Sequence, residues 1–95
     1  MLKIEPRHLK IVQSVLANYP YKFYAFGSRV NGNPRKLSDL DICFFDDIPY
    51  HTRQHIVDDF DESDLPYKVD IIDWNSTDNI FQNKIKDDLI IISPL

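Results

Sequence analysis

Three segments of the chain carry apolar residues at the helical spacing of three and four positions. Proline favours the first turn of a helix, and serine or threonine favours the position just before one. The predicted helices run from Pro6 to about Asn18, from about Asp46 to about Phe60, and from a Ser76 or Thr77 cap to about Lys86.

Four shorter segments are rich in aromatic and β-branched residues and predict strands. They are Lys22–Phe26, the run around Asp39–Phe45, Tyr67–Asp73 and Leu89–Ser93. A short helix or turn is expected after Gly27-Ser28, where the first strand breaks. Helices alternating with strands favour an α/β fold, a sheet of about four strands covered mainly by helices. The 95 residues are expected to form a single domain, 1–95.

Composition narrows the function classes. A formal net charge of −4 gives no general basic field, so direct nucleic-acid binding is not expected. Cys43 is the single cysteine and has no partner for an internal disulfide, which fits a reducing cytoplasm. The N-terminal residues lack a long apolar segment, and no apolar run approaches membrane-spanning length. We therefore expect a cytoplasmic protein with no membrane partner.

Acidic residues interrupt two of the predicted strands. Asp39 and Asp41 are two positions apart and project from one strand face. Asp70 interrupts the apolar run of the third strand, and a neighbouring strand would bring it beside the pair. Most isolated Asp-x-Asp pairs simply lie on a solvent-exposed strand face and form no site. Three carboxylates in a small volume, by contrast, repel unless a hard divalent cation lies between them. Asp73 is expected at the strand end, on the face opposite to Asp70, and is a weaker candidate for this site.

Gly27-Ser28 lies between a strand and a helical turn. Backbone N–H groups without a bulky side chain can hold a phosphate there. Three acids for Mg²⁺ and a phosphate-binding turn are the parts that nucleotidyl transfer needs, since two metals can clamp the attacking and leaving oxygens.

Other candidate sites have simpler interpretations. His51 and His55 have zinc-ligand spacing but lack a third partner. Cys43 has no paired base and is expected to be a core or near-site thiol. The acidic run 58–64 lacks the glycine and terminal glutamate of a calcium loop and is expected to be a solvated face. Trp74 is expected to cover the core rather than to stack on a base.

The central motif resembles the polymerase β-type nucleotidyltransferase superfamily, in its minimal nucleotidyltransferase branch. Gly27-Ser28, ten intervening residues and Asp39-Leu40-Asp41 match the family signature, and Val69 to Asp73 resembles its third-acid strand. The resemblance implies a palm-like fold with a mixed sheet, two Mg²⁺ ions as cofactors, and ATP or another nucleoside triphosphate as donor.

The same resemblance implies roles for individual residues. Gly27 and Ser28 would hold the β- and γ-phosphates, and Arg29 would reach a phosphate or form a surface salt bridge. Asp39 and Asp41 would bridge the metals. Asp70 would bind the metal next to the acceptor and help to deprotonate its hydroxyl.

The chain offers nothing beyond the predicted sheet and helices to bind an acceptor. Minimal nucleotidyltransferases are typically paired with a small helical HEPN protein, and in many pairs they act as the antitoxin by adding AMP to the toxin, often on a tyrosine. Three alternatives stay open: a small-molecule nucleotidyltransferase of the kanamycin type, a catalytically inactive binding antitoxin, and a metal-binding α/β domain without transfer activity. The acceptor, the donor base, the stoichiometry and the contribution of Asp73 are left open as well.

Overall fold

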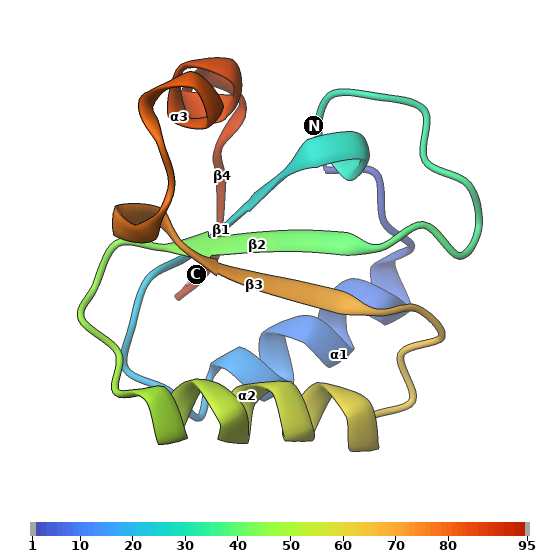
Figure 1. Ribbon diagram of the computed structural model, residues 1–95. Helices are drawn as coiled ribbons and strands as arrows, with labels where there is room; N and C mark the ends of the chain where they lie inside the picture. Colours follow the sequence, from blue (N-terminus) through green and yellow to red (C-terminus); the bar gives the residue numbers. More distant parts are fainter. Residues whose placement is uncertain (1, 95) are drawn as a thin grey trace.

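The computed structural model describes residues 2–94 as a four-stranded sheet with helices on both faces (Figure 1). The strands are β1 (Phe23–Phe26), β2 (Leu40–Phe44), β3 (Val69–Asp73) and β4 (Ile90–Ser93). The α-helices are α1 (Pro6–Leu16), α2 (Tyr50–Glu62) and α3 (Asn79–Ile85). Three single-turn 3₁₀ helices, η1 (Gly27–Arg29), η2 (Trp74–Ser76) and η3 (Lys86–Asp88), lie in the connections. The expected α/β fold is confirmed.

The sheet is mixed, with strand order β3-β2-β1-β4. β1 pairs antiparallel with both β2 and β4, whereas β2 and β3 are parallel. The parallel pair is connected through α2, as a crossover between parallel strands requires. β1 and β2 therefore lie at the centre, and β3 and β4 form the edges.

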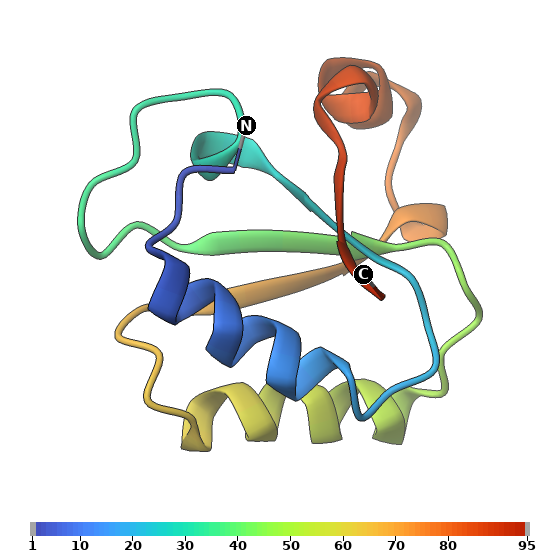
Figure 2. The same cartoon turned by 180° about the vertical axis from the view of Figure 1, so that it is seen from behind.

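One face of the sheet is covered by α1 and α2, which lie side by side beneath it in both views (Figures 1 and 2). Their apolar residues fit the periodicity predicted from the sequence: α1 buries Val12 and Leu16, and α2 buries Ile56 and Phe60. These side chains pack against the alternate residues of β2, Leu40, Ile42 and Phe44. This cluster is the main hydrophobic core.

The opposite face of the sheet is only partly covered. α3 lies over it, and Ile85 forms a smaller cluster with Phe26 and Cys43. η1 rises from the same face at the end of β1, apart from α3 (Figure 1). Asp41 of β2 and Asp70 of β3 belong to this less covered face, which we call the open face.

Several helix boundaries differ from the sequence-based expectation. α2 begins at Tyr50, after Pro49 at its N-cap, rather than at about Asp46, and the Asp46 carboxylate accepts from the Lys22 N–H at 3.1 Å. α1 ends at Leu16 rather than at about Asn18, and the Asn18 amide donates to the Ser14 carbonyl at 3.3 Å. The predicted Ser76 or Thr77 cap of α3 is wrong. Asp78 is the cap, and its carboxylate accepts from the Phe81 N–H at 2.8 Å. The Ser76 and Thr77 hydroxyls instead close the η2 turn, donating to the Asp73 carboxylate and to the Trp74 carbonyl.

No helix within residues 2–94 combines the length and apolar character needed to cross a membrane.

The core cluster predicts that replacing two isoleucines by alanine has very different effects on the stability of the fold. Ile42 is fully buried beneath β2, whereas Ile80 on α3 is 82% exposed. Ile42→Ala should lower the free energy of unfolding by about 2–5 kcal/mol, because it removes buried methyl groups and leaves a cavity. Ile80→Ala is the matched control and should change it by less than about 0.5 kcal/mol. Urea unfolding measures both, and equal losses in the two variants would contradict the assigned core.

Candidate active site on the open face

The Gly27 turn begins where β1 ends. Gly27 has a φ of 83°, a left-handed conformation that residues with a side chain rarely adopt. Its carbonyl accepts from the N–H groups of Val30 and Asn31 at 3.0 and 2.9 Å, which closes the turn and leaves Ser28 exposed. Gly32 packs on the other side of the turn, where an added Cβ would lie 3.1 Å from the Ser28 Cα. Both glycines of the chain therefore shape this one turn.

Asp41 lies directly against the turn. Its Cα partner on β1 is Phe26, the residue before Gly27. A Cβ added at Gly27 would lie 3.3 Å from the Asp41 Cγ and would clash with the Asp41 Oδ2. The absence of a side chain at Gly27 thus brings backbone and carboxylate together, as the expected phosphate site next to the acidic pair requires.

The parallel register brings Asp70 beside Asp41. The two residues are Cα partners across β2 and β3, so their side chains project from the same face of adjacent strands. Asp39 lies just before β2 and is exposed. Partial burial, followed by the charges of Asp70 and Asp39, raises the pKa of Asp41 to about 6. The three acids are therefore electrostatically coupled on one face.

The three carboxylates do not form a closed ligand set as they stand. Among residues 2–94, no three His, Cys, Asp or Glu side chains are gathered closely enough to hold an ion. The Asp70 carboxylate is paired with the Lys68 ammonium at 3.6 Å, on the exposed edge strand. The donor chemistry nonetheless fits a hard divalent cation, because all three groups offer carboxylate oxygens and Asp41 carries an uncompensated charge.

Arg29 lies in a different place from the one expected. Its side chain is 5% exposed, and its guanidinium donates to the carbonyls of Ser38, at 3.0 and 2.7 Å, and of Lys3, at 3.1 Å. The guanidinium also lies over the Tyr67 ring, 3.9 Å from its centroid. A group held by backbone carbonyls on this side is not available to a phosphate at the Gly27 turn, and it forms no salt bridge within residues 2–94. Neither expected role of Arg29 fits.

The remaining candidates have structural positions. Asp73 ends β3, and its carboxylate accepts from the Asn75 N–H and the Ser76 hydroxyl, so it closes a turn. Burial raises the pKa of the Cys43 thiol to about 12, as expected of a core thiol. Trp74 packs on Phe45 and on the smaller cluster. His51 and His55 are exposed on α2, and no metal-ligand group among the described residues includes them.

Comparison with known proteins agrees with this geometry. The family model described as polymerase beta, nucleotidyltransferase matches residues 10–94. A relative from Haemophilus influenzae, named probable protein adenylyltransferase MntA, is 37% identical over 95 residues, which cover 96% of this chain and 83% of the relative. The match spans the Gly27 turn and all three acidic residues. The chain therefore belongs to the polymerase β-like nucleotidyltransferase superfamily, in its minimal nucleotidyltransferase branch.

Proposed function

We propose that this protein transfers AMP from ATP to a hydroxyl group of a partner protein. The observation that carries the proposal is the position of Asp41, which lies against the Gly27 backbone on one side and pairs with Asp70 on the other. A phosphate held at the turn would thus lie next to the acids that would bind the Mg²⁺ ions neutralising its charge. The printed name of the Haemophilus influenzae relative, a probable protein adenylyltransferase, supports a protein as acceptor.

The donor side of the proposed site is the Gly27 turn. With no side chain at Gly27, the triphosphate can approach the backbone N–H groups closely. The exposed Ser28 hydroxyl is available to donate to a phosphate oxygen. Together, these groups would hold the β- and γ-phosphates, and the α-phosphate would lie on the side of Asp41.

The acceptor side of the proposed site is Asp70. The acceptor oxygen attacks the α-phosphorus, its proton passes to the Asp70 carboxylate, and the bond from the α-phosphorus to the bridging oxygen breaks to release pyrophosphate. Asp70 is on the edge strand and partly exposed, so a hydroxyl of another molecule can reach it. In the free protein, Lys68 pairs with this carboxylate and balances its charge.

Asp39, Asp41 and Asp70 are the residues that would hold Mg²⁺, two ions by family resemblance. Bound there, Mg²⁺ would supply positive charge to the triphosphate and to the acceptor oxygen. The raised pKa of Asp41 supports this assignment, because partial burial and then the charges of Asp70 and Asp39 disfavour its ionised form, and a bound cation would relieve both effects.

The acceptor is proposed to lie on a small helical HEPN-type protein, with this chain as the antitoxin of the pair in the cytoplasm. Within residues 2–94, the sheet is accompanied only by three α-helices and three single 3₁₀ turns. Two apolar residues outside the core are highly exposed, Leu37 in the loop before β2 at 61% and Ile80 on α3 at 82%, and they are available for contact with a partner. A small-molecule acceptor, or inhibition of the partner by binding alone, are the alternatives.

Replacing Gly27 tests the donor site. Gly27→Val should abolish binding of a non-hydrolysable ATP analogue, because the new side chain clashes with Asp41 and blocks the backbone. Unfolding should stay cooperative at a lower Tm, because φ at this position disfavours a side chain. Ser28→Ala keeps the backbone groups and should weaken binding only about tenfold. Calorimetric titration with Mg²⁺ measures both, and unchanged affinity in Gly27→Val would place the nucleotide elsewhere.

The raised pKa of Asp41 predicts a pH-dependent gain in stability on its replacement. In the folded state this carboxyl titrates near pH 6 instead of its ordinary value of 3.8. The folded protein therefore binds more protons than the unfolded chain between these values, and the contribution of Asp41 to stability falls as the pH rises through this range.

Asp41→Asn should then be more stable than the wild type at pH 7.5 in EDTA, with a smaller difference at pH 4.5. Mg²⁺ should raise the Tm of the wild type more than that of the variant, because a ligand of the folded state stabilises it. Thermal unfolding at the two pH values measures these effects. A wild type that does not respond to Mg²⁺ would contradict the metal assignment.

Transfer to the partner can be separated from binding to it. With labelled ATP and Mg²⁺, the wild type should label the HEPN-type protein, whereas the double variant Asp39→Asn, Asp41→Asn should not. The wild type and the double variant should both still form the complex with the partner. Asp58→Asn with Asp61→Asn makes the same charge change at two exposed positions of α2 and should keep transfer. A stable complex that inhibits the partner without ever acquiring label would favour the binding alternative.

A further inference from the structure

A polar pocket lies at the N-terminal end of α1 and is not lined by the three acidic residues of the open face. It encloses about 470 Å³, within the range of small-ligand sites. The N-terminal segment, the first turn of α1, the loop before β2 and the segment before β3 contribute its lining, and none of Gly27, Ser28, Asp39, Asp41 or Asp70 does. We call it the α1 pocket.

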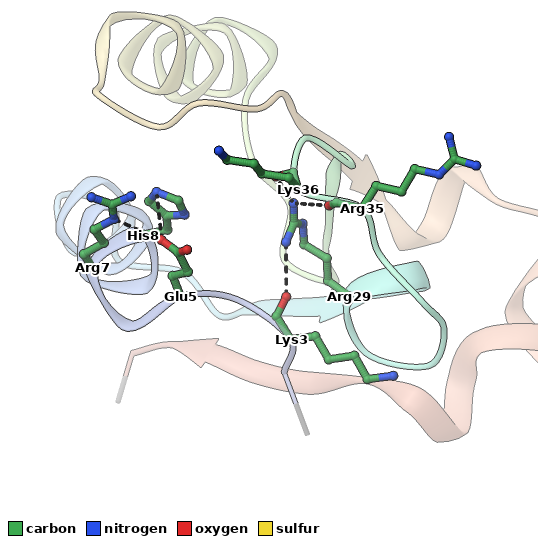
Figure 3. A network of polar contacts seen from close by, with 7 residues as sticks. All are labelled: Lys3, Glu5, Arg7, His8, Arg29, Arg35 and Lys36. Atoms are coloured by element: carbon green, nitrogen blue, oxygen red, sulfur yellow. Dashed lines mark hydrogen bonds and ion pairs between the residues drawn. The ribbon is translucent and has the colours of Figure 1, made fainter.

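The α1 pocket concentrates positive charge in an acidic protein. Five of the eleven Lys and Arg residues line it, but only one of the fifteen Asp and Glu residues, Glu5. Figure 3 shows Lys36 extending from its loop toward Arg7 and His8, whereas Arg35 and Lys3 extend away from them. The Lys36 ammonium has no ion pair or hydrogen bond within residues 2–94.

The first turn of α1 also lacks the negative charge that a helix N-terminus favours. Glu5 is at the cap position, but its side chain makes no capping hydrogen bond, and the first turn contains no acid. The Glu5 carboxylate is paired instead with Arg7 at 3.0 Å and His8 at 3.7 Å. Pro6 has no N–H, and the Leu9 N–H donates to the Glu5 carbonyl. The N–H groups of Arg7 and His8, two residues that line the pocket, therefore lack a side-chain acceptor, and an anion would be stabilised there.

Two buried polar groups line the same pocket. Arg29 is 5% exposed and carries a full positive charge that carbonyls, rather than a carboxylate, surround. Tyr67 is 8% exposed, and its buried hydroxyl has no hydrogen-bond partner within residues 2–94. A buried hydroxyl without a partner lowers stability unless a ligand accepts from it.

We propose that the α1 pocket is a second anion-binding site, which takes a compact phosphate-class anion such as inorganic pyrophosphate or the phosphate group of a small molecule. Lys36, the α1 N-terminus and the Tyr67 hydroxyl supply its donors, and Arg29 supplies a fixed charge beneath them. A long polyanion fits less well, because the acidic run at residues 58–64 ends two residues before Pro66 of the lining and would repel an extended backbone. The site does not depend on the transfer activity.

Titration with pyrophosphate in EDTA at low salt tests the site without activity as a readout. The wild type should bind saturably, and Lys36→Gln should bind about tenfold more weakly, because a charge-assisted contact is lost. Tyr67→Phe should bind more weakly as well, although its Tm without anion should equal or exceed that of the wild type. Lys84→Gln, an exposed lysine on α3, is the charge-matched control and should bind like the wild type.

Gly27→Val separates this site from the donor site, since it should leave pyrophosphate binding in EDTA unchanged. The proposal requires weaker binding in the Lys36 and Tyr67 variants and unchanged binding in the Lys84 and Gly27 variants. Any other pattern would overturn it. Phosphate, pyrophosphate and AMP are titrated separately, and the tightest of the three identifies the source of the anion. A short single-stranded RNA that binds more tightly than all three would make this a nucleic-acid surface and overturn the assignment to a compact anion.

Discussion

The parallel pairing of β2 with β3 is the constraint on which the open face depends. It places Asp41 beside Asp70, although two carboxylates in adjacent positions repel. The register is held from the other face of the sheet, where Leu40, Ile42 and Phe44 are almost completely buried. A slip of one residue would turn these side chains toward the open face and the acids toward the core. Hydrophobic burial by α1 and α2 therefore holds the like charges together.

The same register sets the distance between the acids and the Gly27 turn. Because β1 pairs with β2 through Phe26 and Asp41, the chain after Phe26 must leave the sheet next to a carboxylate. A residue with a side chain would meet both a steric clash and an unfavourable φ there. Glycine satisfies both requirements. The pairing of β1 with β2 therefore explains why the chain has glycine at position 27 and why the turn lies against Asp41.

Much of this arrangement is predictable from the sequence, because it depends on local periodicity. The strands, the shared face of Asp39 and Asp41, and the anomaly of Asp70 all follow from alternation of side chains. The sequence does not single out Asp78 as the helix cap, because Ser76, Thr77 and Asp78 are all good capping residues and the choice among them depends on the η2 turn. Strand order and register depend on contacts distant in sequence, which periodicity does not encode.

The position of Arg29 is not predictable from the sequence for a different reason. A single arginine in a polar turn is usually solvated, and nothing nearby in the sequence predicts that Lys3 and Ser38 supply carbonyls to it. Its planar guanidinium reaches both at once and also covers the Tyr67 ring, a combination that lysine cannot reproduce. The Ser38 carbonyl that it fixes belongs to the residue directly before Asp39.

Arg29 therefore connects two regions of the molecule. One is the loop that leads into the acidic strand, and the other is the α1 pocket, of which Arg29 is a wall. The guanidinium donates to the Ser38 carbonyl on one side and to the Lys3 carbonyl on the other, so one buried side chain joins the N-terminal segment to the loop before Asp39. Its planar fork satisfies both carbonyls at once, and both regions therefore depend on this one residue.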